Sequence, residues 1–276
     1  MSTATRPADK LVAPRPDLPR DRPRAVSLTV RALGPLLLIG AWWTSSATGL
    51  LTPDILAGPP DVVRAVGELW GNGELPDALA ASLTRSGIGL LLGLVAGVVL
   101  GVVTGFSRSG DELLDSSLQA MRTIPFLALV PLFMVWFGIT ETAKILLIAF
   151  ATTFPMYVST AGGVRGTDRK LLEAMRSFGM GRLALVREVV LPAALPSLLS
   201  GLRLSMTLSV IALVAAEEIN ATAGIGYLMA QAQAYARTDV LAVCILVYAL
   251  LGLTADGIVR LLERFLMPWR ALGAVR

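Results

Sequence analysis

The run SGIGLLLGLVAGVVLGVVTGF, which occupies residues 86–106, decides the fold because it carries no charged residue over its whole length. About 20 predominantly apolar residues are enough for a helix to cross the hydrocarbon core of a bilayer. A helix is the expected form because lipid cannot satisfy backbone polar groups, whereas a transmembrane β-barrel needs short alternating segments. The run therefore predicts a membrane-spanning helix.

Five further apolar stretches lie on either side of this run, at 32–51, 123–140, 145–164, 195–216 and 240–259. The first three carry no charge, and the last two are interrupted only by Arg203 and Asp256. We therefore predict an all-α membrane protein with six transmembrane helices, in one domain over 32–265 that lies in the lipid bilayer.

The composition supports this fold class and excludes several functions. The chain has 276 residues, of which 54% are hydrophobic and only 16% are charged. Soluble domains carry about 25% charged residues, so this chain has too few ions to cover a surface that faces water. There is no histidine and a single cysteine, Cys244, which excludes disulfide scaffolds, most zinc sites and Ser-His-Asp triads. We expect a non-catalytic chain that binds no metal, no cofactor and no nucleic acid.

Basic residues gather in three places, and this predicts the orientation in the membrane. The tail 1–31 holds seven basic against three acidic residues, the loop 165–188 holds six against three, and further arginines follow residue 259. Because cytoplasmic loops carry the excess of lysine and arginine, we expect both chain ends and this loop in the cytoplasm, with the chain in the inner cell membrane. The proline-rich tail 1–31 predicts disorder, and 266–276 predicts a short cytoplasmic tail.

The second predicted span carries five glycines at a strict four-residue spacing. They are Gly89, Gly93, Gly97, Gly101 and Gly105. Residues four apart share one face of a helix, and glycines on such a face let a neighbouring backbone approach closely. The pattern predicts tight helix packing, either within the chain or against a second copy.

The loop between the fourth and fifth predicted spans, 165–192, contains the sequence LLEAMRSFG at 171–179. Its apolar residues recur at spacings of three and four, which predicts a short amphipathic helix that ends at Gly179. A second short helix over 182–190 should stop near Pro192. The apolar face of this pair either needs a partner groove or lies at the membrane interface.

This loop resembles the EAA loop of ATP-binding-cassette (ABC) importer permeases, whose pattern is EAA-x3-G-x9-I-x-L-P. The matching positions are Glu173, Ala174, Gly179, Val189, Leu191 and Pro192. Met175 replaces the second alanine, and Val189 replaces the isoleucine. The sequence RTIPFLALVPLF at 122–133, followed by WFG at 136–138, is similar to permeases for aliphatic sulfonates, taurine and nitrate. The resemblance covers about 61–270.

The resemblance implies a type I ABC importer transmembrane domain whose cytoplasmic loop helix sits in a groove of a separate ATPase subunit. The residues implied in this coupling are Leu171, Leu172, Glu173, Ala174, Met175, Phe178, Gly179, Leu191 and Pro192. In this family Glu173 would act as a polar anchor or as the residue that starts the helix. The implied complex holds two permeases, two ATPases and one external solute-binding protein.

The chain itself has no ATP-binding motif, so ATP and magnesium would be used by the partner ATPase. A P-loop needs a lysine that follows a glycine. The only lysines are Lys10, Lys144 and Lys170, and none of them follows a glycine. The energy for transport must then come from another subunit.

Polar residues inside the predicted spans are candidates for the translocation pathway. Arg203 either faces the cavity, where a guanidinium attracts an anion, or holds loop carbonyls near the cytoplasmic boundary. Glu217, beside Glu218, is a candidate gate or structural residue that holds 224–227 or contacts the binding protein. Further candidates either line the path or hold helices together. They are Thr152, Thr153, Tyr157 and Ser159.

We therefore expect the permease subunit of an importer for a small anion, either an aliphatic sulfonate or taurine. Nitrate, nitrite, cyanate or another small nitrogen- or sulfur-containing solute remains an alternative within the same mechanism. An ion-coupled secondary transporter is the alternative class, and it would show inverted repeats and acidic residues at the membrane midplane. We find no such repeat in the sequence.

Overall fold

The computed structural model describes residues 24–52, 54–106, 116–218 and 221–267, and these residues form helices and no strand. The all-α fold class is therefore confirmed. The chain divides into two units, 1–50 and 51–276, which we describe separately. The predicted tail 266–276 lies almost wholly outside the described residues, because helix α12 ends at Leu266 and the description ends at residue 267.

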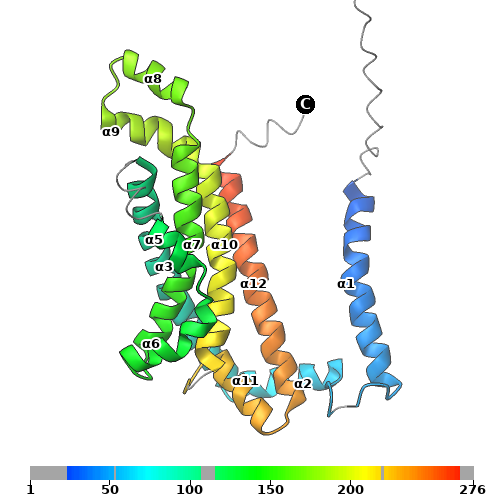
Figure 1. Cartoon of the computed structure of the whole chain (residues 1–276). Helices are drawn as coiled ribbons and strands as arrows, with labels where there is room; N and C mark the ends of the chain where they lie inside the picture. Colours follow the sequence, from blue (N-terminus) through cyan, green and yellow to red (C-terminus); the bar gives the residue numbers. More distant parts are fainter. Residues whose placement is uncertain (1–23, 53, 107–115, 219–220, 268–276) are drawn as a thin grey trace, which may run out of the picture. The chain divides into compact units, whose positions relative to one another are not determined.

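The first unit contains one described helix, α1 (Arg24–Ala47), which corresponds to the predicted span 32–51 (Figure 1). The helix begins at Arg24, directly after Pro23, so the predicted boundary of the tail at residue 31 is too late. The physical reason is the distribution of proline. The prolines of the tail stop at residue 23, and the next one, Pro35, is accommodated inside the helix.

Four helices of the second unit are long and apolar enough to cross a membrane. They are α3 (Glu74–Phe106), α7 (Glu141–Arg165), α10 (Leu191–Glu218) and α12 (Thr238–Leu266). Helix α7 packs between α3 and α10, and α12 packs on α10 (Figure 1). These helices contain the predicted spans 86–106, 145–164, 195–216 and 240–259.

The predicted span 123–140 is wrong as one continuous helix. The chain there forms α5 (Ser116–Arg122), a 3-10 turn η2 (Phe126–Leu129) and α6 (Val130–Phe137). Pro125 caps the 3-10 turn, and Gly138, with φ of 73°, ends α6. The apolar part, Phe126–Phe137, rises only about 18 Å at 1.5 Å per residue, which is less than the membrane core.

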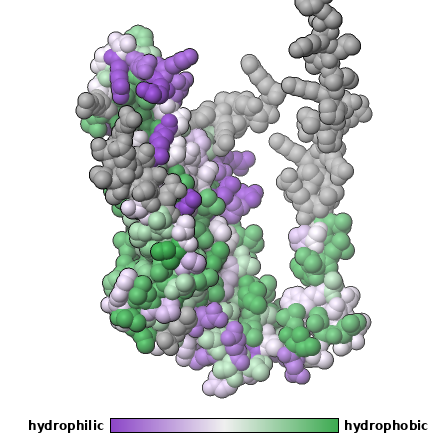
Figure 2. Space-filling model, viewed as in Figure 1, coloured by the Kyte–Doolittle hydropathy of each residue, from purple (hydrophilic) through white to green (hydrophobic). Residues whose placement is uncertain are grey.

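Shorter helices cover the two ends of the second unit. Helices α2 (Pro59–Gly71) and α11 (Ile225–Ala234) lie at one end, where both contact α12. Helices α8 (Arg169–Ser177) and α9 (Arg182–Leu185) lie at the opposite end (Figure 1). Hydrophilic residues gather around α8 and α9, whereas hydrophobic residues cover much of the middle of the bundle (Figure 2). This distribution is that of a protein whose middle faces lipid.

The prediction that the second loop helix stops near Pro192 is wrong. Helix α9 passes through a π-helical segment, η3 (Val186–Val190), directly into α10. The Leu191 N–H donates to the Val186 carbonyl, five residues back. Because this wider turn replaces the usual four-residue bonding just before Pro192, the proline is accommodated where the helix bends (Figure 1).

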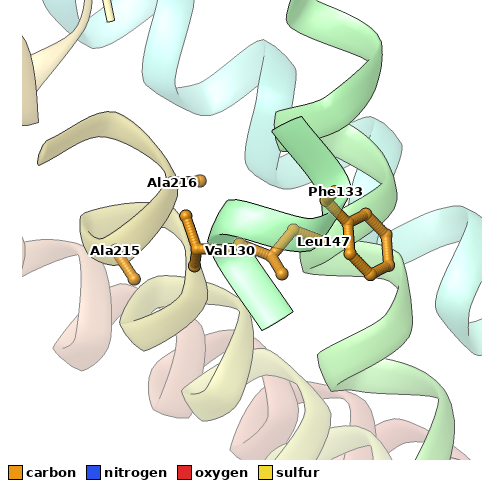
Figure 3. Packing of buried hydrophobic residues seen from close by; sticks show 5 residues of the cluster. All are labelled: Val130, Phe133, Leu147, Ala215 and Ala216. Carbon is orange, nitrogen blue, oxygen red and sulfur yellow. The ribbon is translucent and has the colours of Figure 1, made fainter. Parts of the chain in front are cut away.

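The core of the second unit forms where α6 packs against α7 and the end of α10. Val130 and Phe133 of α6 lie against Leu147 of α7 and against Ala215 and Ala216 of α10 (Figure 3). This packing fixes the end of α10, where the candidate site begins.

Candidate functional site

The five glycines of α3 face α7, residue by residue. The nearest α7 side chains are Ile148, Thr152, Met156, Thr160 and Val164, opposite Gly89, Gly93, Gly97, Gly101 and Gly105 respectively. Both series advance by four residues and in the same direction along the chain. The two helices therefore run parallel, in a register that repeats at every turn.

The approach is so close that a side chain on α3 has no room. A Cβ atom at Gly93 would lie 2.0 Å from Thr152 Oγ1 and 2.6 Å from the Ala149 carbonyl oxygen. At Gly97 it would lie 2.6 Å from the Thr153 carbonyl oxygen. Two of these contacts are with backbone, which cannot rotate away. The glycine face thus packs within the chain, against α7, which is one of the two arrangements expected from the sequence.

The same face of α3 continues beyond the glycines to two polar residues. Ser82 and Arg85 precede Gly89 at the helical spacings of three and four, and both are buried, at 0% and 4% exposure. A buried guanidinium is costly unless it is paired. Arg85 is paired on both sides.

Arg85 joins three helices through its guanidinium. Its Nη1 donates to Glu217 Oε1 of α10 and to the Ala223 carbonyl, each over 2.6 Å. Its Nη2 donates over 2.9 Å to Glu141 Oε1 of α7, and its Nε donates to the other Glu141 oxygen. Lys144 Nζ lies 2.9 Å from the same Glu141 Oε1. Two cations therefore balance two carboxylates.

Glu217 is the most enclosed member of this cluster, with a side chain that is 0% exposed. Its carboxylate accepts from Ser82 Oγ over 2.8 Å, from the Gly226 N–H over 3.0 Å and from Tyr248 Oη over 3.4 Å. Ser82 Oγ in turn accepts from the Ile225 N–H over 2.9 Å. The two N–H groups belong to the first turn of α11, where such donors lack partners within the helix.

We call this group the buried ion-pair cluster, and define it as the buried Ser82, Arg85, Lys144 and Glu217 together with Glu141, whose side chain is 54% exposed at the rim of the cluster. It brings α3, α7 and α10 together and holds the beginning of α11. Of its members, only Glu217 is among the candidate residues predicted from the sequence. The sequence pattern also contains Ser82 and Arg85, because these residues extend the glycine face of α3 at the same helical spacing.

The other pathway candidates do not gather around Glu217. Thr152 and Tyr157 are buried, at 0% and 2% exposure, and Thr153 Oγ1 donates to the Ala149 carbonyl of its own helix. Arg203 pairs with two carboxylates of α12, since Nη2 lies 3.0 Å from Glu263 Oε2 and Nε lies 3.4 Å from Asp256 Oδ1. None of these four residues lines the cavity between α2 and α12, the cavity beside the α8–α9 loop or the two cavities between α7 and α10.

The coupling-loop candidates lie at the other end, on α8 and in the turn after it. Asp168 caps α8, since its Oδ1 accepts from the Lys170 N–H over 2.9 Å. Glu173 lies in the middle of this helix, so it does not start the helix. Gly179 has φ of 83°, and the Met180 N–H donates to the Met175 carbonyl over 3.2 Å, which closes the helix in a Schellman motif.

No described residue of α8 is buried. The side chains of Phe178 and Leu183 are 84% and 82% exposed, and Leu171 and Leu191 are also exposed. A cavity of about 780 Å³ lies beside the loop, lined by Phe106, Arg176, Met180, Gly181, Leu185 and Val186. The loop thus presents apolar side chains that the described part of the chain leaves uncovered.

A polar cavity of about 350 Å³ lies at the opposite end, between α2 and the beginning of α12. It is lined by ionisable residues of both signs, Asp54, Asp61, Arg64, Glu68, Arg237 and Asp239. Hydrogen bonds to Asp239 raise the pKa of the Arg237 guanidinium above its usual value. Arg237 is therefore charged at any pH at which the protein is studied.

Comparison with known proteins agrees with these features. The family described as "Binding-protein-dependent transport system inner membrane component" matches residues 89–267. "Putative aliphatic sulfonates transport permease protein SsuC" of Escherichia coli (strain K12) is 46% identical over 235 residues, which is 85% of this chain and 89% of the relative. The SsuC of Bacillus subtilis (strain 168) is 39% identical, over 86% of each chain. "Taurine transport system permease protein TauC" of Escherichia coli (strain K12) is 36% identical, over 89% and 90%.

Two solved structures share the fold. An amino acid ABC transporter crystallised with histidines superposes with a TM-score of 0.59 at 19% identity, covering 72% of this chain and 97% of that chain. An inward-facing form of the methionine ABC transporter MetNI superposes with a TM-score of 0.54 at 23% identity, covering 67% and 94%. These likenesses identify the fold as that of a type I ABC importer transmembrane domain.

Proposed function

Because the chain belongs to the family of binding-protein-dependent transport system inner membrane components, we propose that it forms the membrane pathway of an importer for aliphatic sulfonates or taurine. The chain is a multi-pass ABC importer permease and no enzyme, and its family works with a separate ATPase and a binding protein. The ion-coupled secondary transporter considered above is therefore discarded.

The substrate class rests on identity over most of both chains. Two relatives named for aliphatic sulfonates and one named for taurine are 36% to 46% identical to this chain. These solutes share a sulfonate group, so the proposal favours sulfonate recognition over nitrate, nitrite or cyanate. The single observation that carries the substrate class is the 46% identity with the Escherichia coli permease.

We propose that the α8–α9 loop docks into the ATPase. In support, α8 is an amphipathic helix that rests on α9 and buries none of its described residues. Two apolar side chains of the loop, Phe178 and Leu183, are exposed to solvent, and a partner groove would bury them. The coupling residues are those of the EAA pattern, from Leu171 to Gly179, with Leu191 and Pro192 at the bend into α10.

Orientation and stoichiometry follow from this docking. The α8–α9 end would face the cytoplasm, as the basic residues of 165–188 favour, and both termini would lie on that side. The opposite end, with α2 and α11, would meet the external binding protein. Two copies of this chain would assemble with two ATPases, which use ATP and magnesium, because each copy offers one coupling loop.

Copurification tests the docking. We expect the wild-type chain to retain its ATPase through detergent extraction and size exclusion, whereas Phe178→Asp releases it. Tyr235→Asp serves as the matched control, because Tyr235 is an aromatic residue of 77% exposure at the opposite end. An ATPase that stays bound to Phe178→Asp and dissociates from Tyr235→Asp would refute docking at this loop.

Uptake into proteoliposomes tests the function. We expect the full complex with its binding protein to accumulate ethanesulfonate or taurine only when ATP and magnesium are present on the ATPase side. Nitrate added in excess should not compete. Accumulation by this chain alone, or uptake of nitrate in preference to both sulfonates, would contradict the proposal.

A further inference from the structure

We propose that a groove between α7 and α10 holds the sulfonate during passage, and that Arg122 is its charged contact. This inference rests on the proposed function and adds residues on the pathway. The groove consists of two adjoining cavities in the described part of the chain, and of the pathway candidates chosen from the sequence only Ser159 lines them.

The first cavity has a volume of about 320 Å³ and is mostly apolar. Its walls come from three places, the stretch from the last residue of α5 to the first residue of η2, one face of α7, and α10. The aromatic rings that line it are Phe126, Phe150 and Phe154, and the last two stack edge to face with centroids 4.9 Å apart. Pockets for small ligands measure roughly 300–1,000 Å³, so this volume suits a solute of a few heavy atoms.

The second cavity, of about 330 Å³, continues the groove toward the α8–α9 end. Ser159 lines both cavities, which therefore adjoin at this residue. The remaining walls are formed by Gly162 of α7 and by Pro196, Ser197 and Ser200 of α10. A solute thus meets aromatic rings first and hydroxyl groups next, which is a change from an apolar to a polar lining.

Arg122 is the one charged residue that lines either cavity. The other arginines near the bundle core are neutralised, Arg85 by two glutamates and Arg203 by Asp256 and Glu263. Among the residues that the structure describes, no carboxylate lies within 4.0 Å of the Arg122 side chain, and no carboxylate lines the groove. Arg122 therefore supplies a positive charge that is available to an anion.

The chemistry of the groove matches an alkylsulfonate. The sulfonate group presents three oxygens and one negative charge, which suit the forked donors of a guanidinium. The alkyl chain would lie against Phe126, Phe150 and Phe154. Because Arg122 is exposed to solvent, its contact with the anion is screened and weak, and a transport path requires release as well as binding.

Transport by the reconstituted complex tests the charged contact. Arg122→Gln should raise the butane-1-sulfonate concentration for half-maximal uptake about threefold to tenfold, because a charge-assisted hydrogen bond is lost that solvent screens only in part. ATP hydrolysis stimulated by the loaded binding protein should persist. Arg260→Gln, which removes an exposed arginine outside the groove, should leave uptake unchanged.

The apolar contact is tested by chain length. Phe126→Ser should lower the preference for butane-1-sulfonate over methanesulfonate about threefold to tenfold, because the ring no longer covers the alkyl chain. The control Phe265→Ser removes an exposed ring of α12 at 74% exposure and should not change the preference. An unchanged preference in Phe126→Ser would place the alkyl chain elsewhere.

Chemical labelling gives a measurement that is independent of transport. On a Cys244→Ala background, Ser159→Cys in the permease–ATPase complex should react with a charged methanethiosulfonate reagent, and butane-1-sulfonate should slow the reaction. Thr152→Cys is the matched control on the same helix, because Thr152 faces α3 and is 0% exposed, so it should not react.

The outcomes separate this inference from the proposed function. Normal uptake by Arg122→Gln, together with unprotected labelling at Ser159→Cys, would overturn the inference and leave the importer intact. Labelling that is fast in detergent, slow in lipid vesicles and indifferent to butane-1-sulfonate would assign the groove to an acyl chain and also overturn it. If the wild-type complex transports no sulfonate, the proposed function itself fails.

Discussion

The Arg85 guanidinium of α3 donates a hydrogen bond of 2.6 Å to the Glu217 carboxylate in the last turn of α10, across 132 positions of sequence. Both side chains are almost fully buried. The pair lies where α11 begins, and Glu217 also accepts from the Gly226 N–H. The two residues therefore connect the packing of the long helices to the position of a short helix at one end of the bundle.

We expect Glu217→Gln to lower the free energy of unfolding by about 3 kcal/mol or more, because breaking a buried ion pair leaves an uncompensated charge. The measurement is chemical unfolding in detergent, with the loss of helix monitored by circular dichroism. Arg64→Gln is the control, since the exposed Arg64 pairs with Asp61, and such a pair contributes about 1 kcal/mol or less. Equal losses in both variants would argue against the buried ion-pair cluster.

Gly93→Ala should separate α3 from α7 and destabilise the protein by about 1–3 kcal/mol, since the new Cβ would meet Thr152 Oγ1 and a backbone carbonyl. Gly87→Ala on the same helix has nothing within 4 Å and should be neutral or stabilising, because alanine favours the helix by about 1 kcal/mol. Thermal unfolding of both variants in detergent measures the difference. If Gly87→Ala lowered the thermal stability more than Gly93→Ala, the proposed register between α3 and α7 would be refuted.

Ser82→Ala should cost about 1–3 kcal/mol, because it leaves the buried Ile225 N–H without its acceptor and removes a donor to Glu217. Faster hydrogen exchange at the first turn of α11 should accompany the loss. Ser200→Ala is the comparison, since Ser200 is exposed and donates only to the Pro196 carbonyl of its own helix. Unaltered exchange at α11 in Ser82→Ala would show that this hydroxyl does not hold the helix.

Gly179→Asp should weaken ATPase retention strongly, because an aspartate strains the backbone at φ of 83° and opens the end of α8. Gly181→Asp adds the same charge two residues later, where the backbone is not left-handed and nothing lies within 4 Å. We expect Gly181→Asp to retain more ATPase on copurification, with both variants inserted in the membrane. If Gly181→Asp retained less ATPase than Gly179→Asp, the added charge, rather than the turn at Gly179, would decide docking.

The glycine series illustrates how far local periodicity reaches. The four-residue spacing of Gly89 to Gly105 identified one face of α3 as a close-packing surface, because helix geometry alone places such residues together. The spacing did not identify the partner. The register between α3 and α7 shows that Thr152 of α7 fills the space at Gly93. Thr152 is consequently unavailable to line a path.

Charged residues illustrate the opposite case. Arg203 and Glu217 stood out because ions are rare within apolar spans, but rarity does not reveal their partners. Arg203 is neutralised by two carboxylates of α12, and Glu217 is enclosed by a residue of α3 that the sequence analysis passed over. Arg122, by contrast, lies at the edge of a predicted span, and only the cavity beside it makes it notable.

The sequence by itself determined the membrane class, the position of the four long apolar helices, the glycine face and the short amphipathic helix α8. Each of these depends on composition or on spacing within one helix, which the chain carries locally. The break of 123–140 and the bend before Pro192 have local causes, in Pro125, Gly138 and a π-helical turn. The tertiary structure alone decided the partners of Arg85, Arg203 and Ser205. Those features depend on contacts between segments more than 50 residues apart, and no local pattern encodes the register in which such segments meet.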